Sequence, residues 1–276
     1  MRADVLLVER GLAPSRTAAQ RLIAAGLVFA CEGGSRMVLT KPSVSVAEDT
    51  SLEVEASDLD RFVSRGGLKL DGALTHVGLD VAHLRCLDVG QSTGGFTDCL
   101  LQRGAAQVVG VDVGHDQLHA RMRTDARVSC IEGVNARSLD ESAFVGAALA
   151  AIPRQKPVDD GTINRGQGRS NNVAFDLIVA DVSFISLTKV LPQWPPLLAN
   201  NGHVLSLVKP QFEVGADNIN RGGIVRDVSL YATVEATILA ACSQAGLRVL
   251  EYFDSAITGT DGNREFFVYA AANYAR

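Results

Sequence analysis

A glycine-rich turn that follows an expected strand is the sharpest chemical signal in the sequence. The stretch "LDVGQSTGGFTD" (87–98) predicts a strand that ends at Asp88, a tight turn, and then a helix. The glycines of this turn let a ligand approach the backbone closely, where any side chain would clash. The dinucleotide pattern G-x-G-x-x-G fails, because Ser92 stands in place of its second glycine. The turn therefore predicts a ligand site of a different kind.

A second carboxylate, Asp112, ends the next expected strand, 24 residues after Asp88. A carboxylate there suits the paired hydroxyls of a ribose, and this spacing is typical of the S-adenosylmethionine pocket of Rossmann-like methyltransferases. A nicotinamide-binding turn and plain packing glycines stay open as alternatives, because a glycine turn alone is a weak motif. The residues predicted to line the cofactor pocket are Asp88, Gly90, Ser92, Thr93, Gly94, Gly95, Phe96, Asp112, Val113, Asn135 and Asp181.

Two lysines and two carboxylates stand at the ends of other expected elements. They are Lys69 in a helix, Asp181 after "FDLIVA", Lys209 after "HVLSLV", and Glu265 at the start of the last strand. Parallel strands end at one edge of a sheet, and an antiparallel last strand begins there. A neutral lysine amine at this edge could take the proton of a ribose hydroxyl. Each residue alone is more simply a solvated charge, but the four together predict a catalytic site.

Alternating strands and helices from Arg85 onward position these residues. The predicted strands are 85–90, 107–113, 128–133, 175–183, 203–210, 247–257 and 264–273, the last two as a hairpin, with helices at 94–104 and 229–246. This alternation predicts an α/β fold, a Rossmann-like seven-stranded sheet covered on both faces. Gly66 and Gly67 predict a turn just ahead of the helix that carries Lys69.

The first 60 residues differ in character and predict a small α+β recognition domain. Ser15 begins a helix that stops at Gly26, and short strands follow in 27–40 and 43–55. We predict that this recognition domain spans 1–60, that a linker spans 61–64, and that the α/β methyltransferase domain spans 65–276.

Residues 153–173 are polar and rich in Gly, Asn and Arg, and they join an expected helix to a strand. A connection of this kind lies opposite the edge where ligands bind. We therefore predict a flexible and inert insertion.

The composition describes a soluble globular protein. The chain has 276 residues, 47% of them hydrophobic and 21% charged, and a net charge of −5. Five cysteines, an odd number without a C-x-x-C pair, favour a reducing cytoplasm over disulfides or zinc. No apolar run approaches the roughly 18–20 residues that span a bilayer. We therefore predict no membrane partner. The histidines of "HDQLH" (115–119) lack a third ligand, so we also predict no metal site.

Six ordered motifs together resemble one family: "SRGGLKL", "DVGQSTGGFTD", "ADVSFISL", "VKPQFE", "GGIVRD" and "NREFF". They are similar to the TlyA family, in which a ribosomal-protein-S-four-like RNA-binding domain precedes an FtsJ-like methyltransferase domain. The resemblance implies S-adenosylmethionine as cofactor, and ribosomal RNA or ribosomal subunits as partner. It implies 2′-O-methylation of cytidine ribose in 16S or 23S RNA by the tetrad Lys69, Asp181, Lys209 and Glu265.

The chain departs from the family pattern at several places. Gln91 replaces a small residue and Asp116 a common glycine, which puts cofactor affinity in question. "FACEGG" replaces the usual Val-Asn-Gly of the amino-terminal domain, and 153–173 is an insertion.

Some relatives are labelled haemolysins. A pore-forming haemolysin would need membrane-inserting segments, and an RNA-binding protein with an inactive methyltransferase domain would be expected to lose tetrad residues.

Local charge gives qualified support for RNA binding. Through Val46 the chain has six basic and three acidic residues, but acidic residues in 48–60 bring the first 60 residues to −3. Phosphate binding needs a local basic face, and a solvated helix face is the simpler alternative. The predicted RNA contacts are Arg2, Ser15, Arg16, Arg21, Arg61 and Arg65. The sequence does not indicate an oligomeric state.

Overall fold

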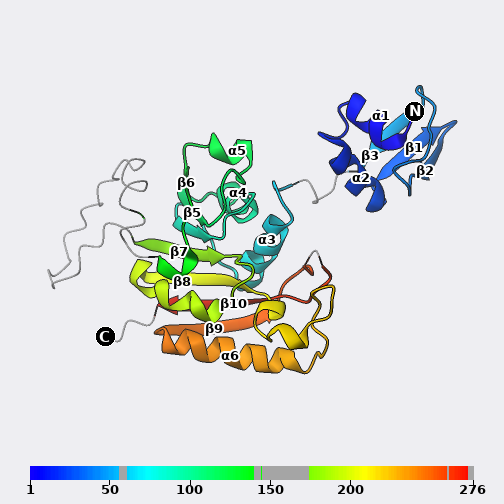
Figure 1. Cartoon of the computed structure of the whole chain (residues 1–276). Helices are drawn as coiled ribbons and strands as arrows, with labels where there is room; N and C mark the ends of the chain where they lie inside the picture. The colour runs from blue at the N-terminus through cyan, green and yellow to red at the C-terminus, as the bar shows by residue number, and fades with distance from the viewer. Residues whose placement is uncertain (56–60, 140–143, 145–173, 260, 273–276) are drawn as a thin grey trace. The chain divides into compact units, whose positions relative to one another are not determined.

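The structure is a computed structural model that describes residues 1–55, 61–139, 144, 174–259 and 261–272 (Figure 1). The chain divides into two compact units, Met1–Arg61 and Phe62–Arg276. The predicted insertion at 153–173 lies outside the described residues. Among the helices that are described, none has the length and apolar character that crossing a bilayer requires.

The smaller unit packs two helices against a three-stranded antiparallel sheet. Its elements are α1 (Ala3–Glu9), α2 (Arg16–Ala24), β1 (Val28–Glu32), β2 (Ser35–Val38) and β3 (Ser51–Val54). The strand order is β2-β1-β3. The Oγ of Ser15 accepts a hydrogen bond from the Ala18 amide at 3.2 Å, which confirms the predicted start of α2. Leu7, Ile23 and Val28 are fully or almost fully buried in the core of this unit.

The larger unit is built on a seven-stranded sheet. Its strands are β4 (Arg85–Val89), β5 (Gln107–Asp112), β6 (Val128–Glu132), β7 (Phe175–Ala180), β8 (Leu198–Val208), β9 (Leu247–Asp254) and β10 (Phe266–Ala272). The order is β6-β5-β4-β7-β8-β10-β9, and β10 alone runs antiparallel to its two neighbours. The predicted Rossmann-like fold with its terminal hairpin is confirmed. The order places β4 and β7, the strands that end nearest Asp88 and Asp181, side by side.

Helices cover both faces of this sheet. They are α3 (Gly66–Val77), α4 (Gly95–Gln102), the single turn α5 (Ala120–Arg123) and α6 (Leu230–Gln244). Figure 1 shows α3 and α4 on one side of the sheet and α6 on the other. Leu87 and Val89 of β4 pack in the cluster that includes α6, whereas Cys86 packs in the cluster of α3 and α4. This alternation is the period of a strand buried on both faces.

The prediction of a turn ahead of the helix at Gly66 and Gly67 is wrong, because both residues are helical and begin α3. A Cβ atom on Gly67 would lie 2.3 Å from Cγ of Phe62, so glycine is required for close packing there. Phe62 is buried, and the Val63 amide donates to Oδ2 of Asp98 at 2.8 Å. Residues 62–64, which the sequence analysis assigned to a linker, therefore pack as part of the larger unit.

Candidate active site

The glycine turn after β4 passes close to the end of β7. Gly90 has a φ of +82°, and its amide donates to the Val111 carbonyl at 2.9 Å. A Cβ atom at position 90 would lie 2.7 Å from the backbone oxygen of Asp181. Glycine is therefore needed both for the left-handed conformation and for the approach of the two strand ends.

Asp88 is fully buried beneath this turn. Its Oδ2 accepts a hydrogen bond from the Thr97 hydroxyl at 2.7 Å, and Nε2 of Gln91 donates to the same hydroxyl at 2.9 Å. The pKa of Asp88 is raised to about 7, chiefly by burial and also by the charges of Asp181 and Asp112, against the lowering effect of the Thr97 hydrogen bond. Oδ1 of Asp88 and Oε1 of Gln91 have no hydrogen-bond partner among the described residues. The site thus contains two buried oxygen atoms that could still accept a hydrogen bond from a ligand.

The unusual Gln91 has a clear place in the fold. A Cβ atom on Gly110 of β5 would lie 1.9 Å from the Gln91 carboxamide carbon. The side chain therefore occupies space that a residue with a side chain at position 110 would fill, and it is 3% exposed. Gln91 thus fills the space beside Gly110 beneath the turn.

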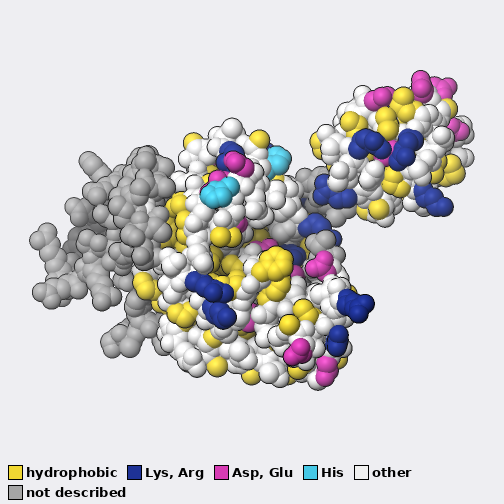
Figure 2. Space-filling view, viewed as in Figure 1, with side chains coloured by type: hydrophobic (Ala, Val, Ile, Leu, Met, Phe, Trp, Pro, Cys, Tyr) yellow, Lys and Arg dark blue, Asp and Glu magenta, His cyan; other side chains and the backbone are white. Residues whose placement is uncertain are grey.

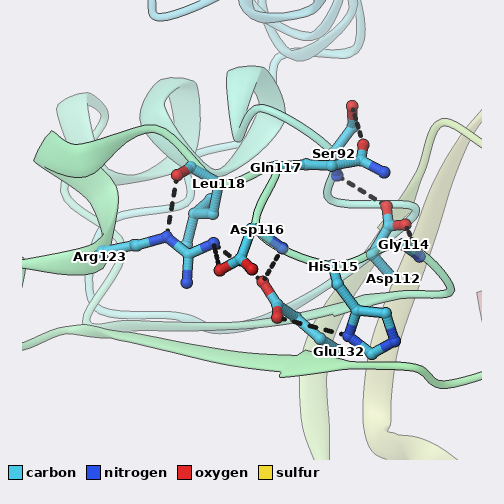
Figure 3. A network of polar contacts seen from close by, with 9 residues as sticks. All are labelled: Ser92, Asp112, Gly114, His115, Asp116, Gln117, Leu118, Arg123 and Glu132. Atoms are coloured by element: carbon cyan, nitrogen blue, oxygen red, sulfur yellow. Dashed lines mark hydrogen bonds and ion pairs between the residues drawn. The ribbon is translucent and has the colours of Figure 1, made fainter.

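Asp112 is held by the backbone of the loops around it (Figure 3). Its Oδ2 accepts from the Ser92 amide at 2.8 Å and its Oδ1 from the Gly114 amide at 2.7 Å. A carboxylate offers about four lone-pair positions, so two further bonds remain possible. The carboxylate is thus fixed in orientation and still able to accept two hydroxyl groups.

Glu132, at the end of β6, fastens the loop that follows Asp112 (Figure 3). Its Oε1 accepts from the Asp116 amide and from the Arg123 guanidinium, each at 3.0 Å. Desolvation alone would raise the pKa of Glu132. The two hydrogen bonds, together with the charge of Arg123, outweigh it and lower the pKa. Asp116 has a φ of +55°, in the region that favours glycine but that aspartate tolerates. The departure from the family's glycine therefore keeps the same loop conformation available.

The two histidines of "HDQLH" serve different neighbours. Nδ1 of His115 lies 3.7 Å from Glu132, and Nδ1 of His119 caps α5 by accepting from the Arg121 amide at 3.2 Å. Within the described ranges, no three His, Cys, Asp or Glu side chains are grouped as a metal site would require.

The remaining residues of the predicted pocket are spread around this loop system. Thr93 precedes Gly94, which has a φ of +94° and caps the start of α4 at Gly95. The ring of Phe96 is buried and stacks on Phe267, so only its backbone can face a ligand. Val113 is 70% exposed, and Oδ1 of Asn135 accepts from the Arg137 amide at 3.0 Å.

The four predicted catalytic residues form two lysine–carboxylate pairs. Nζ of Lys69 lies 2.5 Å from Oε2 of Glu265, and Nζ of Lys209 lies 2.6 Å from Oδ1 of Asp181. Oε2 of Glu265 and Oδ1 of Asp181 accept no hydrogen bond with suitable angles, so both lysine contacts are ion pairs. Lys209 also donates to the Ser183 hydroxyl at 2.8 Å.

The sheet explains why both pairs lie at one edge. Phe266 of β10 is opposite Val208 of β8, so Glu265 and Lys209 are the next residues beyond the ladder on each strand. β7 runs parallel to β8 and ends at Ala180, immediately before Asp181. The glycine turn after β4 reaches the same edge, since Gly90 lies against Asp181.

Two loop-fastening residues could not be identified from sequence. Oε1 and Oε2 of Glu213 accept from the Leu187 amide at 2.7 Å and the Ser186 hydroxyl at 2.6 Å, which ties the loop after β8 to the loop after β7. Burial raises the pKa of Glu213. Asn263 joins "GGIVRD" to "NREFF", because it accepts from the Val225 amide and donates to the Gly223 carbonyl. Both residues stand inside the family motifs, but their types alone do not reveal their partners.

The residues predicted to contact RNA have varied surroundings. Arg2 and Arg16 both contact Asp4, and the Ser15 hydroxyl is engaged as the α2 cap. Arg21 stands in the last turn of α2. Arg61 ends the smaller unit, whereas Arg65 belongs to the larger one and donates to the Thr258 carbonyl at 3.4 Å.

Comparison with known proteins identifies relatives of both units. The sequence profile of the FtsJ-like methyltransferase family matches residues 62–272, and that of the S4 domain matches residues 1–29. The chain is 39% identical over 268 residues to the 16S/23S rRNA (cytidine-2′-O)-methyltransferase TlyA of Mycobacterium tuberculosis, covering 97% of this chain and 88% of that protein. It is 34% identical to Hemolysin A of Brachyspira hyodysenteriae, covering 98% and 99%. A solved hemolysin-named structure from Streptococcus thermophilus superimposes with a TM-score of 0.69 at 36% identity, covering 100% of this chain and 89% of that one.

Proposed function

The chain belongs to the TlyA family, with an S4 domain ahead of an FtsJ-like methyltransferase domain, and from this premise we propose that it methylates ribosomal RNA. The proposed reaction transfers a methyl group from S-adenosylmethionine to the ribose 2′ oxygen of a cytidine. The observation that carries the proposal is the convergence of two lysine–carboxylate pairs on the edge that bears the glycine turn.

The residues present fit S-adenosylmethionine. Gly90 leaves the backbone open, the Asp88 and Gln91 oxygens beneath the turn lack partners, and Asp112 keeps lone pairs for two ribose hydroxyls. Ser92, Thr93, Gly94, Gly95 and the Phe96 backbone would surround the cofactor, with Val113 and Asn135 on the side of β5 and β6. When bound, the cofactor supplies a methyl group already activated on a sulfonium. The task that remains for the chain is to position the ribose oxygen and remove its proton.

Lys209 is the proposed general base. An amine nitrogen has three positions besides its carbon, and Asp181 and Ser183 each occupy one of them. In the neutral amine the third position is the lone pair, which is therefore directed away from both partners. Because the Lys209 amine is already oriented, it can take up the 2′ hydroxyl proton without a change of rotamer. Lys69 and Glu265 would complete the polar edge and hold the target nucleotide.

An exposed aromatic side chain next to this base supports a nucleotide substrate. Phe184 is 90% exposed and has a φ of +62°, which is rare for a bulky residue. Its ring centroid lies 5.2 Å from that of Phe212, which follows Lys209 by three residues. Single-stranded RNA bases stack on exposed aromatic rings of this kind, so the pair suits an unstacked base.

Substrate recognition is assigned to the smaller unit. S4 domains and rRNA-methylating relatives support RNA as its ligand, and Arg2, Arg16, Arg21 and Arg61 supply cations on this unit. Arg65 would add a cation at the start of the methyltransferase unit. Ser15 would act through its cap on α2.

The decisive experiment incubates the chain with labelled S-adenosylmethionine and isolated 30S and 50S ribosomal subunits. We expect label on a cytidine ribose, located by primer extension or mass spectrometry. Binding of subunits without any transfer would favour an RNA-binding protein with an inactive methyltransferase domain.

A second experiment tests the cofactor site separately. Asp112→Ala should weaken S-adenosylmethionine binding about tenfold or more in calorimetry, because a charge-assisted hydrogen bond contributes roughly 1.5–3 kcal/mol. Glu132→Gln is the control, since Glu132 fastens the neighbouring loop from the other side. Equal losses in both variants would assign the effect to the loop and not to the ribose contact.

A further inference from the structure

A buried carboxylate in the smaller unit holds two arginines in a fixed arrangement. Oδ1 of Asp4 accepts from Nε of Arg2 at 2.9 Å, and its Oδ2 accepts from the Arg2 guanidinium at 3.0 Å. Oδ2 also accepts from Arg16 at 3.2 Å and from Nε2 of Gln20 at 2.8 Å. Asp4 has no exposed surface, whereas the side chains of Arg2 and Arg16 are 47% and 57% exposed.

This arrangement is more specific than a surface ion pair. Arg2 makes the two-pronged contact that orients a guanidinium plane, and the bonds from Arg2, with those from Gln20 and Arg16, hold the pKa of Asp4 well below its ordinary range against the effect of burial. Asp4 stands on α1, while Arg16 and Gln20 stand on α2. One carboxylate therefore fixes the relative position of two cations that come from different elements.

The cations keep most of their capacity to bind an anion. A guanidinium carries five N–H donors, of which Asp4 uses two from Arg2 and one from Arg16. Two cations on one anion also leave a net positive charge. On the face of the smaller unit seen in Figure 2, basic side chains gather over the middle while acidic ones gather along its upper edge.

We propose that Asp4, supported by Gln20, is a positioning residue that holds Arg2 and Arg16 as a preorganised seat for a backbone phosphate of folded RNA. The proposal rests on the proposed function, because that function supplies the RNA. The contribution of Asp4 is not attraction, since its charge repels phosphate. Asp4 instead removes the rotamer freedom that two exposed arginines would otherwise lose on binding, and it leaves their remaining donors for the phosphate.

Because Asp4 repels phosphate, the proposal and simple electrostatics predict opposite changes in RNA affinity when its charge is removed. Asp4→Asn removes one negative charge from the RNA-binding unit, and so does Glu9→Gln at the exposed end of the same helix. Charge alone predicts equal or tighter binding for both variants. The seat predicts that Asp4→Asn binds ribosomal RNA transcripts about tenfold more weakly than Glu9→Gln in the full-length protein.

Two further measurements guard against a simple folding defect. S-adenosylmethionine affinity and thermal unfolding of the full chain report whether the variant is native. If Asp4→Asn does not fold, the double variant Arg2→Lys with Arg16→Lys decides, because it keeps both charges and removes the guanidinium planes. Weaker RNA binding by this variant supports the seat, and wild-type affinity overturns it.

The remaining outcomes separate the seat from its rivals. Binding of Asp4→Asn as tight as that of Glu9→Gln, in a folded protein, overturns the proposal. A loss of binding to anionic phosphatidylglycerol vesicles without a loss of RNA binding would assign the seat to a membrane and also overturn it. Failure of wild-type methyl transfer would instead contradict the proposed function, because every seat measurement is a binding measurement.

Discussion

The two lysine–carboxylate pairs at the sheet edge are alike in chemistry and different in surroundings. The side chains of Lys69 and Glu265 are 9% and 2% exposed, whereas those of Lys209 and Asp181 are 12% and 24% exposed. Lys209 has a further partner in Ser183, on a loop that Glu213 fastens from the other side. The first pair is almost fully enclosed by the fold, whereas the second is partly open, mainly at Asp181.

Enclosure changes what an ion pair does for the protein. Removing one partner of a buried pair leaves the other charge without compensation, at a cost of several kcal/mol. A pair with access to water tolerates the same change much better, because the solvent takes over part of the interaction. We therefore expect Lys69–Glu265 to matter most for stability and Lys209–Asp181 to matter most for turnover.

Lys209→Ala should give the largest effect on turnover. Loss of a general base lowers a rate by about 10²–10⁴-fold, so we expect a decrease of roughly a thousandfold in methyl transfer, about 4 kcal/mol of barrier. Affinity for S-adenosylmethionine should stay within about twofold. Single-turnover kinetics with saturating cofactor and ribosomal subunits measure the step directly. Lys209→Arg should not restore it, because a guanidinium stays protonated; a fast Arg variant would remove Lys209 from the role of base.

Lys69→Ala should show the reverse balance. We expect a loss in transfer rate of at least about tenfold, roughly 1.4 kcal/mol, but a loss of unfolding free energy on the order of 3 kcal/mol. The stability loss arises because the Glu265 carboxylate stays buried with no cation beside it. Lys209→Ala should lose only about 1 kcal/mol of stability. Urea denaturation of both variants makes the comparison.

A double variant separates the two contributions of Lys69. Lys69→Met combined with Glu265→Gln removes both charges and should recover most of the stability while transfer stays slow. Wild-type transfer in Lys69→Ala would show that the residue is only a structural charge. Equal stability losses in Lys69→Ala and Lys209→Ala would contradict the distinction between an enclosed and an open pair.

The sheet was predictable because its strands carry a simple pattern. Apolar runs such as 175–183 end in polar or glycine residues, and β7 is buried along its length except at Asp176. The start of α3 was not predictable in this way. Gly66 and Gly67 have the composition of a turn, and only the position of Phe62 explains why a helix needs glycine there.

The residue types of the candidate site could be chosen from sequence, but their pairing could not. Strand ends place Asp181, Lys209 and Glu265 on one edge, yet nothing in the sequence tells which carboxylate takes Lys69. That choice depends on the packing of α3 against the sheet. Local bonds were equally invisible, such as the two backbone amides that orient Asp112.

Ser183→Ala should have a moderate effect that is confined to the open pair. Without the hydroxyl, one position around the Lys209 amine is no longer fixed, and we expect a decrease in kcat of about fivefold with little change in KM. Ser183→Thr keeps a hydroxyl and should restore most of the rate. Ser206→Ala is the control, because the Ser206 hydroxyl is buried in β8 and donates to the Leu207 carbonyl at 3.4 Å, away from the Lys209 amine. Equal effects at both positions would mean that Ser183 does not act through Lys209.

The smallest expected difference between the two pairs is a shift in the pH dependence of stability, for which Asp88 serves as the reporter. Burial and the charges of Asp181 and Asp112 raise the pKa of Asp88 to about 7. Because the unfolded chain ionises this group near pH 4, the native protein binds an extra proton between these values. The stability that this proton contributes is fully present below about pH 4 and is lost as the pH rises through 7. Asp88→Asn, which stays neutral, should lack this loss, a difference on the order of a few kcal/mol.

Denaturation curves at pH 5, 6, 7 and 8 then distinguish the open pair from the enclosed one. Asp181→Asn removes an anion that raises the folded-state pKa of Asp88, so the loss of stability, which begins near pH 4, should be smaller and should level off at a lower pH. Glu265→Gln should shift it less, because Asp181 and Asp112 are the carboxylates that act most strongly on Asp88. Each measurement is read against the same substitution in the Asp88→Asn background, which cancels the titration of other groups. Equal shifts from Asp181→Asn and Glu265→Gln would show that Asp88 responds to the charge of the whole edge, and the two pairs would then not be electrostatically distinct.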